Sequence, residues 1–156
     1  MPIYKHHQVN SVAKLWVWHI TEDEQSLTKN VSLTTHCNQR LQAMSHSNQR
    51  KGFLAVRSLV EAAGISLDQL RYTTDGKPYL EHGPHISFSH TNDFAAVAIG
   101  QGPIGVDVER HRAKVKRVAK KFVNPADQAP QQTIAELTDL WCAKESMYKA
   151  ISIPGI

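Results

Sequence analysis

The sequence predicts an α+β fold in which helices pack on an antiparallel sheet. Short apolar runs separated by turn residues gather in the middle of the 156-residue chain, as is typical of antiparallel strands with tight links. Longer stretches with helical periodicity lie on either side of this region, at about 37–63 and 134–150. Segregated helices and strands, rather than a regular alternation, indicate the α+β class.

One long helix is expected from about Cys37 to Ala63, because this stretch lacks proline and has a single interior glycine, Gly52. Gly64 is a suitable stop. The apolar residues of this stretch form a plausible buried stripe, namely Leu41, Met44, Phe53, Val56, Leu59 and Val60.

Three further helices are expected. A possible capping box of Thr21 and Glu24 indicates a short helix there. A basic helix is expected over Ala113–Phe122 and a long one over Ile134–Ala150. The long helix has four large residues at its expected core edge, namely Leu137, Leu140, Trp141 and Tyr148.

Strands are predicted where β-branched and aromatic residues alternate between turn signals. Asp75-Gly76 marks a hairpin within Leu70–Leu80. The other predicted strands are Lys14–Ile20, His85–Ser89, Phe94–Ile99 and Ile104–Glu109.

Composition narrows the class of protein. Apolar residues make up 41% and charged residues 21% of the chain, which argues against wholesale disorder. The net charge of +4 favours anionic partners without choosing among them. Cys37 and Cys142 form neither a disulfide framework nor a zinc-ligand pattern. With no secretory core or bilayer-spanning run, a soluble cytoplasmic protein is expected.

The most informative segment is the predicted strand Ile104–Glu109. Alternation places Gly105, Asp107 and Glu109 on one face. The two carboxylates are then ~7 Å apart at the backbone, and they repel each other unless a cation lies between them. Magnesium prefers such oxygen ligands. A solvent-facing strand carrying two ordinary acids would show the same pattern.

The second long helix adds a third acid. Glu145 and Lys149 are four residues apart and share a helix face. They could form a routine salt bridge worth ~0.3–0.5 kcal/mol. The functional alternative makes Glu145 a metal ligand or base and Lys149 a phosphate contact.

Two further sites are candidates for binding. Pro78 makes the turn at Lys77 rigid. His90 follows Ser89 where an apolar strand gives way to a loop, and it could hydrogen-bond a phosphate. A solvated turn lysine and a surface histidine are the plain alternatives.

Four segments, in order, resemble the larger, monomeric 4'-phosphopantetheinyl transferases, which activate peptide and polyketide synthetases. They are GKPYL, HISFSH, PIGVDVE and WCAKESMYKA. PIGVDVE and WCAKES are quite specific at this separation. LAVRSLV is also similar to the family's first helix, and the resemblance extends from about Arg50 to Ala150.

The resemblance implies a metal site and a coenzyme A site. The acids that would hold Mg2+ together with the coenzyme A pyrophosphate are Asp107, Glu109 and Glu145. The residues implied to contact coenzyme A are Arg57, with Arg50 or Lys51, and Lys77, Pro78, Ser89, His90 and Lys149.

The implied activity is that of a holo-[acyl-carrier-protein] synthase. A serine of an acyl or peptidyl carrier protein, from fatty-acid or secondary-metabolite synthesis, attacks the β-phosphate of coenzyme A and releases adenosine 3',5'-bisphosphate. Glu145 is the candidate base, with Asp107, Lys149 and His90 as the other catalytic residues. The basic stretch Arg110–Lys121 would steer acidic carriers or simply form a solvated face.

Two α+β halves are expected from the resemblance. Residues 1–110 would form the first half, and residues 111–156 would begin the second with the basic helix and the metal-ligand helix, leaving it truncated. The alternative function is a catalytically incompetent homologue that binds coenzyme A or a carrier protein. A nucleic-acid-binding module would explain the basic stretch but would leave the three acids without a role.

Overall fold

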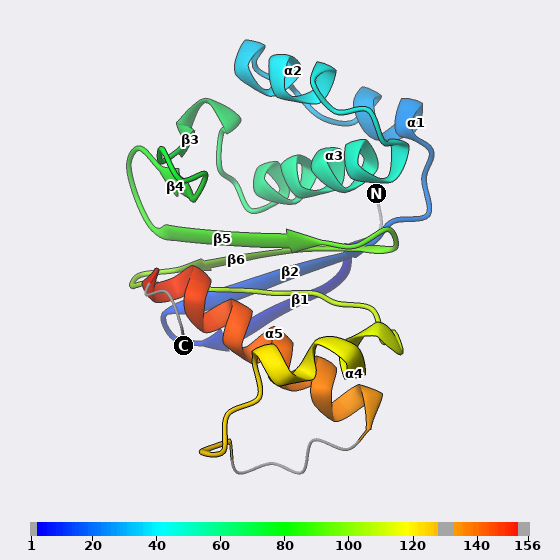
Figure 1. Cartoon of the computed structure of the whole chain (residues 1–156). Coiled ribbons are helices and arrows are strands. Elements are labelled where there is room, and N and C mark those ends of the chain that lie inside the picture. The colour runs from blue at the N-terminus through cyan, green and yellow to red at the C-terminus, as the bar shows by residue number, and fades with distance from the viewer. Residues whose placement is uncertain (1–2, 128–132, 153–156) are drawn as a thin grey trace.

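The computed structural model describes residues 3–127 and 133–152 and confirms the α+β class (Figure 1). Its elements in chain order are β1 (Ile3–Asn10), β2 (Ala13–His19), α1 (Glu24–Lys29), α2 (Thr35–Gln42), α3 (Ser47–Ala62), η1 (Leu67–Gln69), β3 (Leu70–Tyr72), β4 (Pro78–Leu80), β5 (His85–His90), β6 (Phe94–Gly100), α4 (Lys114–Val118), η2 (Ala119–Lys121) and α5 (Ile134–Ile151).

A four-stranded antiparallel sheet forms the central layer, in the order β1-β2-β6-β5. Figure 1 shows α1, α2, α3 and the β3–β4 hairpin on one side of it and α4 and α5 on the other. The predicted strands at 14–20, 85–89 and 94–99 and the hairpin at 70–80 are confirmed. Strand β1 was not predicted.

The single helix expected from Cys37 to Ala63 is wrong, because the chain breaks between α2 and α3. Arg50 of α3 stabilises this break. Its Nη1 donates to the carbonyl oxygen of Leu41 at 2.6 Å, and its Nε pairs with Glu24 of α1 at 2.7 Å. Carbonyl groups at a helix end need such partners. The predicted stop at Gly64 is confirmed, with φ +80°.

The core lies between α3 and the sheet. Trp18, Leu54, Leu59 and Val97 are fully buried there, and burying side chains of this size contributes ~1.5–3 kcal/mol each. Helix α5 is less enclosed. Its Leu137 is buried, but Tyr148 is 45% exposed, so the expected core position of Tyr148 is wrong.

The segment 104–109 is not a strand, contrary to expectation. The backbone N–H groups of Val106 and Val108 donate to the hydroxyls of Ser87 and Ser89, at 3.1 and 3.3 Å, instead of to a strand's carbonyl groups. These serines alternate along β5 with Phe88, which faces Arg57 of α3. The segment therefore crosses the α5 side of β5 rather than extending the sheet.

Local signals define the ends of the helices. At α1 the cap is Asp23, whose carboxylate accepts from Ser26, rather than the expected Thr21. The predicted basic helix over Ala113–Phe122 is shorter and continues as the 3-10 turn η2. Helix α5 begins with a complete capping box of Thr133 and Glu136. None of the helices in residues 3–127 and 133–152 is long and apolar enough to cross a bilayer.

Replacing Thr133 tests how firmly α5 is anchored. Thr133→Ala removes the hydroxyl that accepts from the Glu136 N–H at 3.1 Å. We expect the free energy of unfolding to fall by about 1 kcal/mol, the usual value of an N-cap. Thr133→Ser keeps the hydroxyl and should retain most of that stability in urea melts. Equal losses in the two variants would contradict a capping role.

Candidate functional site

Asp107 lies at the centre of the site, on the α5 side of β5. Its side chain is only 6% exposed. Its Oδ1 accepts hydrogen bonds from Lys149 Nζ at 2.7 Å and from the Ser89 hydroxyl at 3.0 Å. Lys149 Nζ also donates to the carbonyl oxygen of Val106 at 3.0 Å. Lys149 therefore fixes α5 to the segment 104–109 through both backbone and side chain.

Gly105 allows this close packing. A Cβ built there would lie 1.7 Å from the carbonyl oxygen of Ser146 in α5, far inside van der Waals contact. Only glycine allows the two backbones to approach so closely. The predicted alternation of 105, 107 and 109 toward one side is thus confirmed, although no strand forms.

The other two predicted acids lie near Asp107. Glu109 Oε1 accepts a hydrogen bond from Trp141 Nε1 of α5 at 3.3 Å. Burial raises the pKa of Glu145, and the negative charges of Asp107 and Glu109 raise it further, against the opposing effect of Lys149. The three carboxylates therefore interact electrostatically, as the sequence predicted.

They do not, however, form a ready metal cage. Among the described residues, no group of three or more His, Cys, Asp and Glu side chains is arranged to hold a metal ion. Lys149 already neutralises Asp107. Two observations still fit a cation. Oδ2 of Asp107 is buried without a hydrogen-bond partner in the described part of the chain, and burial together with the negative charges of Asp107 and Glu109 raises the pKa of Glu145.

The thiol of Cys142 also lies near this carboxyl group. Burial and the charge of Asp107 raise the pKa of Cys142 to about 12. The thiol is therefore protonated at neutral pH and is no candidate nucleophile.

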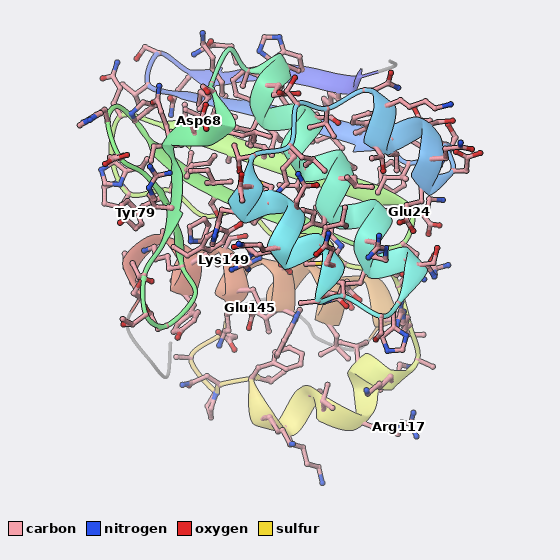
Figure 2. The ribbon with its side chains drawn as sticks, turned by 90° about the horizontal axis from the view of Figure 1, so that it is seen from above. Glu24, Asp68, Tyr79, Arg117, Glu145 and Lys149 are labelled. Atoms are coloured by element: carbon pink, nitrogen blue, oxygen red, sulfur yellow. The ribbon has the colours of Figure 1, made fainter. Side chains whose placement is uncertain are left out.

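A groove of about 300 Å3, which we call the α5 groove, lies beside Lys149. Lys77 enters it from the β3–β4 turn, and its Nζ donates to the Ser152 hydroxyl at 2.7 Å. Figure 2 shows Glu145 and Lys149 close together on α5. The residues lining the groove are Asp75, Gly76, Lys77, Pro78, Ile86, Ser87, Phe88, Tyr148, Lys149 and Ser152. The predicted turn and the predicted helix lysine thus meet in one groove.

His90 is separate from that groove. It lines a second hollow of about 330 Å3, here called the α3 hollow, with His46, Asn48, Gln49, Thr91, Asn92, Glu109 and Arg112. Burial lowers the pKa of His90, and the charges of Arg57 and Lys149 add to the effect. The imidazole is therefore mostly neutral at pH 7. Ser89 points to the opposite side of β5 and positions Asp107 instead.

Two predicted coenzyme A contacts are occupied elsewhere. Arg57 is only 2% exposed. Its guanidinium lies 3.4 Å from the centroid of the Phe53 ring and donates to the Tyr72 hydroxyl. Arg50 joins α1, α2 and α3, as described above. Neither arginine lines the α5 groove or the α3 hollow.

Sequence reasoning missed Ser87 and the close packing of Gly105 on α5, which place Asp107 rather than performing chemistry. A glycine two residues before Asp107 in PIGVDVE, on the same side of the chain, is a signal of close packing. Nothing in the sequence indicated that a serine hydroxyl would receive the backbone N–H of Val106.

Known proteins have sequences similar to parts of this chain. Residues 103–156 match the model of the 4'-phosphopantetheinyl transferase superfamily. A 4'-phosphopantetheinyl transferase of Bacillus subtilis is 32% identical over 98 residues, which cover 58% of this chain and 42% of the relative. Residues 103–156 therefore resemble the 4'-phosphopantetheinyl transferase superfamily. The matched residues include Asp107, Glu109, Glu145 and Lys149.

The chain is similar to two other known proteins. The 4'-phosphopantetheinyl transferase gsp of Aneurinibacillus migulanus is 27% identical over 109 residues, or 64% of this chain and 46% of the relative. A holo-(acyl-carrier-protein) synthase from Bacillus anthracis, solved with CoA (3',5'-ADP), has a TM-score of 0.43 and 21% identity, over 56% of this chain and 92% of that one. That structural similarity is too low to carry an argument about this chain. The chain spans less than half the length of both curated relatives.

The raised pKa of Glu145 predicts a stability effect with a defined sign. Because the folded protein holds this proton more tightly than the unfolded chain, stability falls as pH rises through the unfolded pKa toward the folded one. Without divalent cations, Glu145→Gln should therefore be more stable than the wild type at pH 7 and nearly equal to it below pH ~4. Urea melts at both pH values measure this difference. A glutamine variant that is less stable at pH 7 would contradict it.

Gly105→Ala tests the packing of α5 on the segment 104–109. We expect a loss of about 1–3 kcal/mol in the free energy of unfolding, because the new methyl group meets helix backbone that cannot rotate away. Gly102→Ala is the matched control, since its Cβ would have no atom within 4 Å. Similar urea midpoints for the two variants would show that the close approach is unimportant.

Proposed function

We propose that this chain transfers the 4'-phosphopantetheine group of coenzyme A to a serine of an acyl or peptidyl carrier protein. The observation that carries the proposal is the meeting of Asp107, Glu145 and Lys149 between α5 and the segment 104–109. This meeting lies within the residues that match the superfamily model. We further propose that the reaction depends on Mg2+ and takes place in the cytoplasm.

Asp107, Glu109 and Glu145 are the residues that would hold the cation. A bound Mg2+ would neutralise the negative charge of the transferring phosphate. The buried, unpartnered Oδ2 of Asp107 supports this role, since a buried polar atom without a partner is costly. The hydrogen bond from Lys149 to Asp107 would then weaken, and Lys149 would contact the phosphates of coenzyme A.

The chemical step needs a base and electrostatic support. The serine oxygen would form a bond to the β-phosphorus while the bond from that phosphorus to the leaving phosphate breaks, and adenosine 3',5'-bisphosphate departs. Glu145, directly or through water, would accept the serine proton, a role favoured by its raised pKa. Lys149 and His90 would donate to phosphate oxygens, and no side chain of this protein would become covalently modified.

The α5 groove is the proposed place for coenzyme A. Lys77 and Lys149 offer two cationic groups there, and Phe88 and Tyr148 offer apolar surface. Pro78, Ser89 and Arg57 remain proposed contributors, with Ser89 and Arg57 acting through Asp107 and His90. We propose that the exposed basic stretch Arg110–Lys121 steers an acidic carrier protein. Figure 2 shows Arg117 of this stretch at the periphery, away from Glu145 and Lys149.

The proposed division into two halves agrees with the layers of the fold. Residues 1–110 would include the sheet with α1, α2 and α3. Residues 111–156 would begin the other half with α4 and α5, which lie on the opposite face of the sheet (Figure 1).

The test is a mass measurement of apo carrier protein after incubation with this chain, coenzyme A and Mg2+. We expect a gain of one phosphopantetheine group, abolished by Asp107→Ala and reduced ~100-fold or more by Glu145→Ala, as for other removed electrostatic groups. Glu81→Ala is the control, because Glu81 forms only an exposed ion pair with Arg71 at 2.8 Å.

Thermal melts of each variant separate loss of activity from loss of folding. Full activity of folded Asp107→Ala would overturn the metal assignment. Coenzyme A binding without a mass gain on several carriers would identify the catalytically incompetent homologue instead.

A further inference from the structure

Gly52 of α3 is packed directly against the imidazole of His90. A Cβ built at Gly52 would lie 2.1 Å from Nδ1, 2.5 Å from Cγ and 2.7 Å from Cε1 of that ring, and these are its three nearest atoms. Gly52 is itself buried within the helix. No Cβ could occupy this position while the ring stays where it is.

The backbone does not explain a glycine here. Glycine inside a helix is unfavourable relative to alanine because it has more conformational freedom to lose. Among the described residues the glycines with positive φ are Gly64, Gly76 and Gly83. Gly52 has ordinary helical geometry, so the fit of the imidazole is the local reason that the structure offers for its missing side chain.

The contact fixes where the imidazole lies. His90 is the last residue of β5 and points toward α3, with one side of its ring against Gly52 and another lining the α3 hollow. The charged and titratable groups around it are Arg57 of α3, Lys149 of α5, and the hollow-lining His46, Glu109 and Arg112. A ring held against the helix backbone has few other conformations to lose when it binds a ligand. Its hydrogen bond to the ligand is therefore pre-organised.

We propose that Gly52 is a positioning residue whose missing side chain seats the His90 imidazole for contact with a phosphate of coenzyme A. The ligand's identity rests on the proposed function, whereas the seat rests on the packing of α3 against β5. A larger residue at position 52 would rotate the imidazole away rather than unfold the protein, because the clashing atoms belong to a movable side chain.

A double-mutant cycle tests the proposal on the whole chain. Coenzyme A affinity, measured calorimetrically with Mg2+, is compared for the wild type, Gly52→Ala, His90→Ala and the double variant. We expect His90→Ala to lose on the order of tenfold, the value of one hydrogen bond to a charged group. Gly52→Ala should lose a similar factor and the double variant no more, because both changes remove the same contact.

Gly52→Ala should stabilise the protein when the His90 ring is absent. In the His90→Ala background, Gly52→Ala should raise the melting temperature, since the three nearest atoms are gone and alanine favours the helix. Gly102→Ala is the matched control and should alter neither affinity nor the state of His90. In Gly52→Ala, NMR titration should show the pKa of His90 rising toward its ordinary value as the ring leaves its partly desolvated position against Gly52.

Each outcome decides the question. Wild-type affinity in Gly52→Ala, or losses that add in the double variant, would overturn the proposal. If Gly52→Ala alone fails to fold while the double variant folds, the seat is confirmed. If both fail to fold, it is wrong. If His90→Ala binds coenzyme A normally, the proposed phosphate contact fails, and the NMR signal of His90 in Gly52→Ala still tests the seat.

Discussion

A buried carboxylate has to be balanced by nearby cations and donors, and in this protein that carboxylate is Asp107. Lys149 and Ser89 both bind its Oδ1. Burying such a pair costs desolvation energy that only good geometry offsets. The geometry is good because Lys149 comes from α5, Ser89 from β5 and Asp107 from the segment between them. The three elements therefore have one favourable relative placement, and that placement brings Glu145 beside the pair.

Side chains of strand β5 pack against elements on both faces of the sheet. Ser87 and Ser89 face α5 and hold the segment 104–109, while Phe88 and His90 face α3. The alternation of side chains along a strand makes this division unavoidable. Residues adjacent in sequence, Ser89 and His90, thus have different surroundings, with Ser89 bound to Asp107 and His90 packed against Gly52.

Two glycines allow close packing around the site. Gly105 lets α5 approach the backbone of the segment 104–109, and Gly52 leaves room for the His90 ring on α3. One contact is with rigid backbone and the other with a movable ring, so the first mainly concerns stability and the second mainly concerns position. The raised pKa of Glu145 shows a related compromise, because the burial and the nearby negative charges that make it a better base also oppose its ionisation in the folded protein.

The sequence by itself determined the class of fold, most strand positions, the ends of α5 and the acids of the site. These depend on periodicity, turn residues and caps, which act over a few neighbouring residues. It also predicted the side shared by Gly105, Asp107 and Glu109, since alternation persists in the segment even without a sheet ladder. The family resemblance identified Lys77 and Lys149, which meet in the α5 groove.

Only the tertiary structure decided how these parts combine. The break between α2 and α3 depends on Arg50 reaching the carbonyl of Leu41, and the burial of Arg57 depends on Phe53 and Tyr72. The segment 104–109 lies across β5 because Ser87 and Ser89 bind its N–H groups. Apart from the contact of Arg57 with Phe53 within α3, each of these contacts joins residues on different elements. Local propensity could not reveal them, because their energy exists only once the elements have packed.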